Sequence, residues 1–147
     1  ELYMYLGCIY LIVKDIEKSA DFYSKLLKMN PSSQNKDRWI SFNIVGGTAI
    51  ALYNQKFDDR KIAGSSEEEL KVNYNKEYLN YIKENKTKYG NNVVLNFSVD
   101  DLKAEYIRLK ELFDSAVSKM MYVNIVCPYN FFMVADPDGN LIEITDV

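Results

Sequence analysis

The chain has 147 residues, of which 48% are hydrophobic and 27% charged, with 18 basic and 21 acidic side chains. This is the size and composition of one soluble globular domain, and the mildly acidic balance argues against a nucleic-acid-binding protein. The longest apolar run, near Cys8 to Val13, is too short to cross a bilayer, and no signal-peptide pattern opens the sequence, so a cytoplasmic protein is expected.

The sequence contains no histidine. Histidine is the commonest general base and the commonest ligand of transition metals. Any chemistry would therefore have to use carboxylates, thiols, tyrosines or lysines. The two cysteines, Cys8 and Cys127, form no metal-binding spacing, and two buried, reduced thiols are the simplest expectation.

The first half reads as a strand, a helix and a hairpin. Alternating side chains predict a strand over Leu6 to Val13, and Asp15 is placed to cap a helix that runs to about Lys28. Two more strands are predicted over Arg38 to Val45 and Thr48 to Asn54. The glycine pair between them marks the turn.

The apolar pattern selects the loop of this hairpin. A two-residue loop would bury Ser41 and Asn43, whereas a three-residue loop gives an apolar core face. The core face then holds Ile40, Phe42, Ile44, Ile50 and Leu52, and the opposite face holds Trp39, Ser41, Asn43, Ala49, Ala51 and Tyr53.

A polar segment follows, at about 55–90, that is rich in lysine and glutamate and dotted with tyrosines. Ser65 or Ser66 could cap a helix that begins at Glu67, and a second short helix is possible over Lys76 to Lys83. Two interpretations stay open. The segment is a solvated insertion, or it is a lid whose tyrosines close over a pocket.

The second half repeats the order of the first. A strand is predicted over Asn92 to Val99, Asp101 is placed to cap a helix, and another strand is predicted over Tyr122 to Cys127. The chain closes on two apolar strands, Phe131 to Ala135 and Leu141 to Thr145. The sequence DPDG between them is typical of a hairpin turn.

The two halves also align as an internal repeat. Val13-Lys14-Asp15-Ile16 matches Val99-Asp100-Asp101-Leu102 at an offset of 86, and residues 47–52 match 139–144 at an offset of 92. We therefore predict an α+β fold of two βαβββ modules, about 5–54 and 91–147, in a single domain that holds the polar insertion. The modules should form a cup-shaped, curved mixed sheet with the helices on its outer face.

Alternation along the strands predicts which side chains line the cup. The set is mostly apolar and aromatic with a few polar groups, as small-molecule pockets usually are. It comprises Cys8, Tyr10, Trp39, Ala51, Tyr53, Val94, Asn96, Leu141 and Glu143. A strand tryptophan such as Trp39 can equally be a core residue.

The sequence resembles the vicinal oxygen chelate superfamily, which includes glyoxalase I, extradiol dioxygenases, and fosfomycin- and bleomycin-resistance proteins. The resemblance rests on VKDIEKSADFYSKLL, SVDDL and DPDGNLIEI. It implies two βαβββ modules around a cup, in agreement with the repeat. Metal-dependent members bind a divalent ion at four positions, usually through His or Glu. Here the resemblance places those positions at Cys8, Ala51, Val94 and Glu143.

Only Glu143 keeps a typical ligand, so the resemblance implies no metal cofactor. We expect metal-free binding of a small, partly aromatic or cationic molecule, as in bleomycin-resistance-type sequestration proteins, which are usually homodimers. Glu143 would pair with a cationic or donor group, and Tyr10, Trp39 and Tyr53 would stack on flat parts. Otherwise Glu143 is satisfied internally, by Asn96, Ser98 or a tyrosine.

Two alternatives remain. One is a glyoxalase-type lyase, isomerase or dioxygenase, in which Glu143 is a general base or, with Cys8 and groups not yet placed, binds a metal. The other is a scaffold whose vestigial cup is filled by its own side chains.

Overall fold

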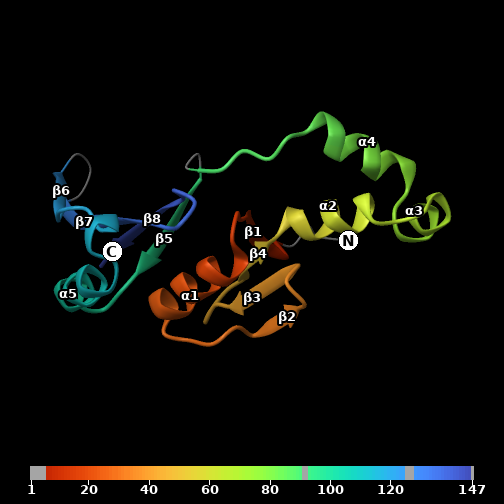
Figure 1. Ribbon diagram of the computed structural model, residues 1–147. Helices are drawn as coiled ribbons and strands as arrows, with labels where there is room; N and C mark the ends of the chain where they lie inside the picture. The colour runs from red at the N-terminus through yellow and green to blue at the C-terminus, as the bar shows by residue number, and fades with distance from the viewer. Residues whose placement is uncertain (1–5, 91–92, 125–127, 147) are drawn as a thin grey trace, which may run out of the picture. The chain divides into compact units, whose positions relative to one another are not determined.

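The computed structural model describes residues 6–90, 93–124 and 128–146. It contains two four-stranded mixed sheets with helices (Figure 1), which confirms the predicted α+β class. By its contacts the chain divides into two units, Glu1–Ala20 with Met29–Lys88, and Asp21–Lys28 with Tyr89–Val147.

The sheet of the first unit has the strand order β1-β4-β3-β2. Its strands are β1 (Cys8–Ile12), β2 (Ser33–Asn35), β3 (Trp39–Asn43) and β4 (Ala49–Tyr53), and β1 runs parallel to β4. Helix α1 (Ile16–Leu27) follows β1, and Asp15 caps it by accepting a 3.1 Å hydrogen bond from the Lys18 amide. Strand β2 was not predicted, because its three residues are polar and exposed.

The β3–β4 hairpin has the predicted three-residue loop, 45–47. The Ile44 amide donates to the Thr48 carbonyl (3.1 Å) and the Gly47 amide to the Ile44 carbonyl (3.2 Å). Gly46 supplies the positive φ of 80° that such a loop requires. Of the predicted core face, Ile40, Phe42, Ile50 and Leu52 are each at most 5% exposed, whereas Ile44, beside the loop, is half-buried.

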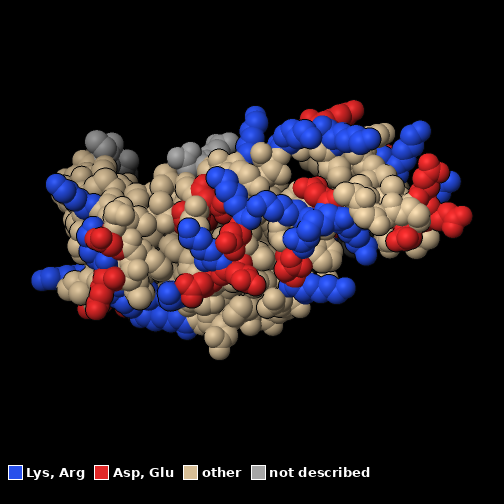
Figure 2. All heavy atoms as spheres, viewed as in Figure 1, with Lys and Arg blue, Asp and Glu red and all other residues tan. Residues whose placement is uncertain are grey.

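The polar segment folds into α2 (Gln55–Ala63), α3 (Glu67–Asn73) and α4 (Lys76–Glu84). Ser66 caps α3, as predicted, whereas α2 was not predicted because it lacks an apolar stripe. Figure 2 shows basic and acidic side chains interspersed over α3 and α4, and neither helix has a buried residue. The insertion is therefore largely solvated, as one interpretation required.

The sheet of the second unit has the order β5-β8-β7-β6. Its elements are β5 (Val94–Ser98), α5 (Leu102–Phe113), a short 3₁₀ helix (Asp114–Ala116), β6 (Met121–Asn124), β7 (Pro128–Ala135) and β8 (Leu141–Thr145). Pro128 begins β7. Cys127 and the rest of 125–127, where a continuous strand was predicted, lie outside the described residues.

The predicted turn between β7 and β8 is organised by Asp136, which is buried. Its Oδ1 accepts from the amides of Asp138 (2.9 Å) and Asn140 (2.8 Å), and Gly139 has a φ of 86°. The Tyr23 hydroxyl, also in the second unit, donates to Asp136 Oδ2 at 2.8 Å. Burial, and then the neighbouring carboxylate, raise the pKa of Tyr23 far above its ordinary value.

The pairing of the strands also shows the internal repeat. Tyr10 of β1 pairs with Ala51 of β4. The residue 86 positions after Tyr10 is Asn96 and the residue 92 positions after Ala51 is Glu143, and these two pair in β5–β8. Both sheets thus have the same parallel pair in the same register. Each unit contains one parallel and two antiparallel pairs, which makes each sheet mixed, as predicted.

Two further predictions concern the burial of the Cys8 thiol and the presence of a membrane-spanning segment. Cys8 is a free thiol, but it is half-buried where a buried side chain was expected. In the part of the chain that the structure describes, no helix has the length and apolarity needed to cross a bilayer.

Candidate functional site

The first unit contains an aromatic pocket of about 290 Å³ on the face of its sheet opposite the core. Strands β1, β3 and β4 and the insertion all contribute to its wall. The lining residues are Tyr10, Ile12, Arg38, Trp39, Tyr53, Gln55, Tyr78, Tyr81 and Ile82. The volume is close to the lower end of the range for small-molecule sites, about 300 Å³.

Three rings on the sheet form the floor of this pocket. Strand pairing places Trp39 opposite Tyr53, and alternation puts Tyr10 on the same face. The ring centroids of Tyr10 and Trp39 are 5.4 Å apart, and those of Tyr10 and Tyr53 are 6.2 Å apart at 88°. Tyr10 remains 53% exposed, so this cluster presents aromatic surface that the first unit itself does not cover.

Helix α4 supplies a second wall. Tyr78, Tyr81 and Ile82 are three and four residues apart, so they lie on one face of the helix. All three line the pocket, which supports the lid interpretation for this part of the insertion. Both interpretations thus hold in part, because the insertion is largely solvated yet contributes these side chains to the wall.

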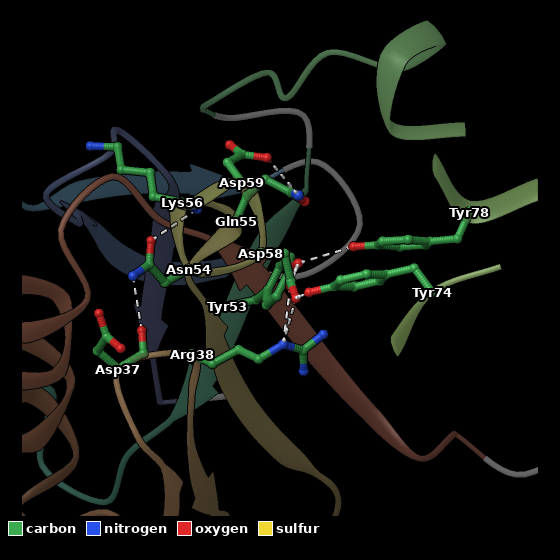
Figure 3. Close-up of polar contacts among 10 residues, drawn as sticks. All are labelled: Asp37, Arg38, Tyr53, Asn54, Gln55, Lys56, Asp58, Asp59, Tyr74 and Tyr78. Carbon is green, nitrogen blue, oxygen red and sulfur yellow. Dashed lines mark hydrogen bonds and ion pairs between the residues drawn. The ribbon is translucent and has the colours of Figure 1, made fainter. Parts of the chain in front are cut away.

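A buried carboxylate ties the insertion to the sheet (Figure 3). Asp58, on α2, is 2% exposed and accepts hydrogen bonds from the hydroxyls of Tyr53 and Tyr74, the latter at 2.7 Å. Arg38 Nε donates to both carboxylate oxygens, at 3.0 and 3.3 Å. The ring of Tyr74 stacks on that of Tyr78, with centroids 5.4 Å apart at 10°. The donors are the last residue of β4, the residue before β3 and the residue after α3, so Asp58 joins the sheet to the insertion.

The electrostatics of this cluster keep the phenols protonated. Burial, and then the hydrogen bond to Asp58, raise the pKa of Tyr53 far above 10 and that of Tyr74 to about 12. Burial is the largest single influence on the pKa of Arg38 and lowers it, but the charge and hydrogen bond of Asp58, together with Tyr53 and Tyr78, make the net shift upward. Asp58 therefore faces two neutral hydroxyl donors and one cation at neutral pH.

The structure places the predicted site residues in two groups. In the first unit, Tyr10, Trp39 and Tyr53 line the pocket, whereas Ala51 is 0% exposed and Cys8 is half-buried. The second unit holds Val94, Asn96, Leu141 and Glu143, paired as Val94 with Leu141 and Asn96 with Glu143.

Glu143 is bound by Asn96, one of the partners predicted for it. Asn96 Nδ2 donates to Glu143 Oε1 at 2.6 Å. One carboxylate oxygen is therefore satisfied within the second unit, and the other accepts no hydrogen bond from the described part of the chain. Glu143 retains acceptor capacity for a ligand.

Arg38 and Asp58 were not predicted as site residues, and only the lid interpretation brought Tyr78 and Tyr81 to a pocket. The tyrosine-rich composition of the insertion was the available signal for the last two. Asp58 carried no signal, because an aspartate in a polar helix is ordinarily exposed.

The four family metal positions do not fit a metal ion. Ala51 and Val94 have no donor atom, which leaves the Cys8 thiol and the Glu143 carboxylate, fewer protein ligands than a catalytic zinc site uses. Among the residues described, no three His, Cys, Asp or Glu side chains are grouped so as to hold a metal.

Two βαβββ modules built on parallel β1–β4 and β5–β8 pairs define a fold class, that of glyoxalase-like proteins. Residues 5–144 match the model of the Glyoxalase/Bleomycin resistance protein/Dioxygenase superfamily, and the chain belongs to that family. The resemblance inferred from sequence is thereby confirmed.

Solved structures agree on the fold. A glyoxalase/bleomycin resistance protein/dioxygenase family enzyme from Burkholderia phytofirmans is 14% identical, with 95% of each chain covered and a TM-score of 0.64. A glyoxalase-related enzyme from Fulvimarina pelagi is 17% identical (95% and 86% covered, TM-score 0.61), and lactoylglutathione lyase from Agrobacterium tumefaciens is 15% identical (95% and 91%, 0.61). No curated protein matches the sequence.

Proposed function

We propose that this chain binds a small, partly aromatic molecule, without a metal ion, in the aromatic pocket of its first unit. The observation that carries the proposal is the convergence of five aromatic side chains, Tyr10, Trp39, Tyr53, Tyr78 and Tyr81, on one pocket of about 290 Å³. Flat rings stack on such surfaces at tilted and edge-on angles like those already present among Tyr10, Trp39 and Tyr53.

The pocket supports an aromatic ligand more strongly than a cationic one. Arg38 lies on the wall with its Cζ 5.1 Å from the centroid of the Tyr53 ring, so that ring already has a cation against it. A second cation would meet like charge there. Of the two ligand types expected from the sequence, the aromatic one is the one this pocket favours.

Sequestration agrees with the chemistry of the side chains. The family positions that would carry a Lewis acid offer a methyl group at Ala51, an isopropyl group at Val94, one thiol and one carboxylate. Binding without transformation requires only shape, apolar surface and a few polar contacts, and the pocket supplies these.

Trp39 is the only tryptophan in the chain and lies in the pocket wall, so its indole N–H gives one NMR signal that reports on the pocket. The test titrates the neutral probe biphenyl-4-carboxamide and follows this signal. We expect a saturable shift in the wild type. We expect affinity about threefold or more weaker in Tyr81→Ala, because one aromatic contact is lost.

The matched control is Tyr122→Ala, which removes a tyrosine of nearly equal exposure (61% against 62% for Tyr81) from the second unit. It should leave the affinity unchanged. An indole signal that does not respond to the probe, or an equal loss in both variants, would contradict the proposed function.

A further inference from the structure

Arg38 has an unused pair of hydrogen-bond donors at the pocket. Its Nε is fixed on Asp58, and its carbonyl accepts a 2.9 Å hydrogen bond from the Asn54 amide, which anchors the backbone next to β3. Among the described residues, its two terminal Nη groups have no protein hydrogen-bond partner, although the side chain is only 36% exposed. In Figure 3 one of these groups points away from Asp58, and the other points to the side of Tyr74.

Arg38 is also the only charged residue among those that line the described pocket. Its guanidinium is held from two sides, by Asp58 at Nε and by the Tyr53 ring at 5.1 Å. The two Nη groups of Arg38 are therefore already oriented in one plane. Such a pair suits a carboxylate, because the two carboxylate oxygens can accept both N–H···O bonds together.

Asp58 does not compete for these donors. Its carboxylate already accepts from Tyr53, Tyr74 and Arg38 Nε. Its charge does offset that of Arg38 at long range, so attraction of an anion should be short-range and should depend on hydrogen bonds more than on diffuse charge. Selectivity for an acid should therefore survive moderate salt.

The geometry points to Arg38 as the residue that sets ligand specificity, so that the pocket takes a planar aromatic carboxylate. The ring system would lie against Tyr10, Trp39 and the α4 tyrosines, and the carboxylate oxygens would accept from the two Nη groups. This inference rests on the proposed function and narrows it to a class of ligand.

The test compares biphenyl-4-carboxylate with biphenyl-4-carboxamide, two probes of nearly the same shape, by the Trp39 indole signal. In the wild type we expect the carboxylate to bind at least about tenfold more tightly, as charge-assisted bidentate pairs do. In Arg38→Lys, which keeps the positive charge facing Asp58 but lacks the paired donors, this preference should fall to about threefold or less. Affinity for the carboxamide should fall less than affinity for the carboxylate, because the single carbonyl oxygen of the amide loses fewer hydrogen bonds.

Arg60→Gln is the matched control, because Arg60 is an exposed arginine of the first unit that pairs with Asp37 and does not line the pocket. It removes one positive charge and should leave the preference intact. Loss of the preference in Arg60→Gln would show a net-charge effect and overturn the role of Arg38.

The two proposals fail in different ways. If the carboxamide binds and the carboxylate binds no more tightly, or if Arg38→Lys keeps the full preference, the Arg38 inference is wrong and the aromatic pocket stands. If neither probe shifts the Trp39 signal, both are wrong.

Discussion

Tyr74 donates a 2.7 Å hydrogen bond to Asp58, sixteen residues earlier in the chain, and this contact links the end of α3 to α2. Neither α3 nor α4 has a buried residue of its own. Their positions in the first unit therefore depend on a few polar and ring contacts, chiefly those of Tyr74 and Tyr78 around Asp58. The pocket wall that α4 provides is consequently only as stable as this cluster.

Asp58→Asn should destabilise the protein by about 3 kcal/mol, because it leaves Arg38 without its charged partner and alters a buried acceptor of three donors. Thermal or urea unfolding measures the loss. Hydrogen exchange should also accelerate selectively over residues 66–85. Asp59→Asn, at an exposed neighbour that accepts a 3.3 Å hydrogen bond from Gln55, is the control and should change stability by less than about 0.5 kcal/mol. Equal effects of the two variants would argue against the role of Asp58.

Alkaline pH should weaken the same cluster. The pKa of Tyr74 is raised from its ordinary value of 10.0 to about 12 in the folded protein. Between these values the unfolded state has lost the phenolic proton while the folded state keeps it, so unfolding becomes easier as pH rises. The contribution is fully present below pH 10 and is lost by about pH 12. Urea unfolding from pH 8 to 11.5 should show a smaller alkaline loss for Tyr74→Phe than for the wild type, and identical pH profiles would contradict the assignment.

The second unit has its own buried hydrogen bond to test. Tyr23→Phe removes the hydroxyl that donates to Asp136 and should cost about 1–3 kcal/mol, since the carboxylate loses a partner in a buried turn. Tyr106→Phe is a suitable control, because Tyr106 packs edge-on against Phe132 with centroids 5.1 Å apart and its ring is retained. The unfolding free energies of the two variants should differ by at least about 1 kcal/mol.

Glu143 remains a predicted partner for a cationic or donor group. On that hypothesis 4-phenylbenzylamine should bind the wild type and lose about tenfold in affinity in Glu143→Gln, since a charge-assisted hydrogen bond is removed. Glutamine keeps an oxygen for Asn96, so folding should be preserved. Unchanged affinity in a calorimetric titration would leave Glu143 as an internal acceptor for Asn96.

Most of the fold could be predicted from the sequence. The offsets of 86 and 92 correspond to equivalent strand registers, and the apolar alternation around Ser41 and Asn43 selected the correct loop length. These predictions succeeded because burial of one strand face dictates register. Strand β2 and helix α2 were missed because their residues are polar and carry no periodic apolar signal.

The site was only partly predictable for a different reason. Alternation found Tyr10, Trp39 and Tyr53, which lie on regular strands. The pairing of Arg38 with Asp58, twenty residues apart, depends on how α2 of the insertion lies against the sheet of the first unit. No local sequence pattern predicts this contact.

The most direct test of metal-free binding is the dissociation constant of biphenyl-4-carboxylate, read from the Trp39 indole signal, in excess EDTA and in excess Zn²⁺. The proposed function predicts saturable binding with the same constant in both, because two of the four family metal positions, Ala51 and Val94, have no donor atom. Binding that disappears in EDTA and returns at one equivalent of Zn²⁺ would contradict it and would favour a metal-dependent enzyme.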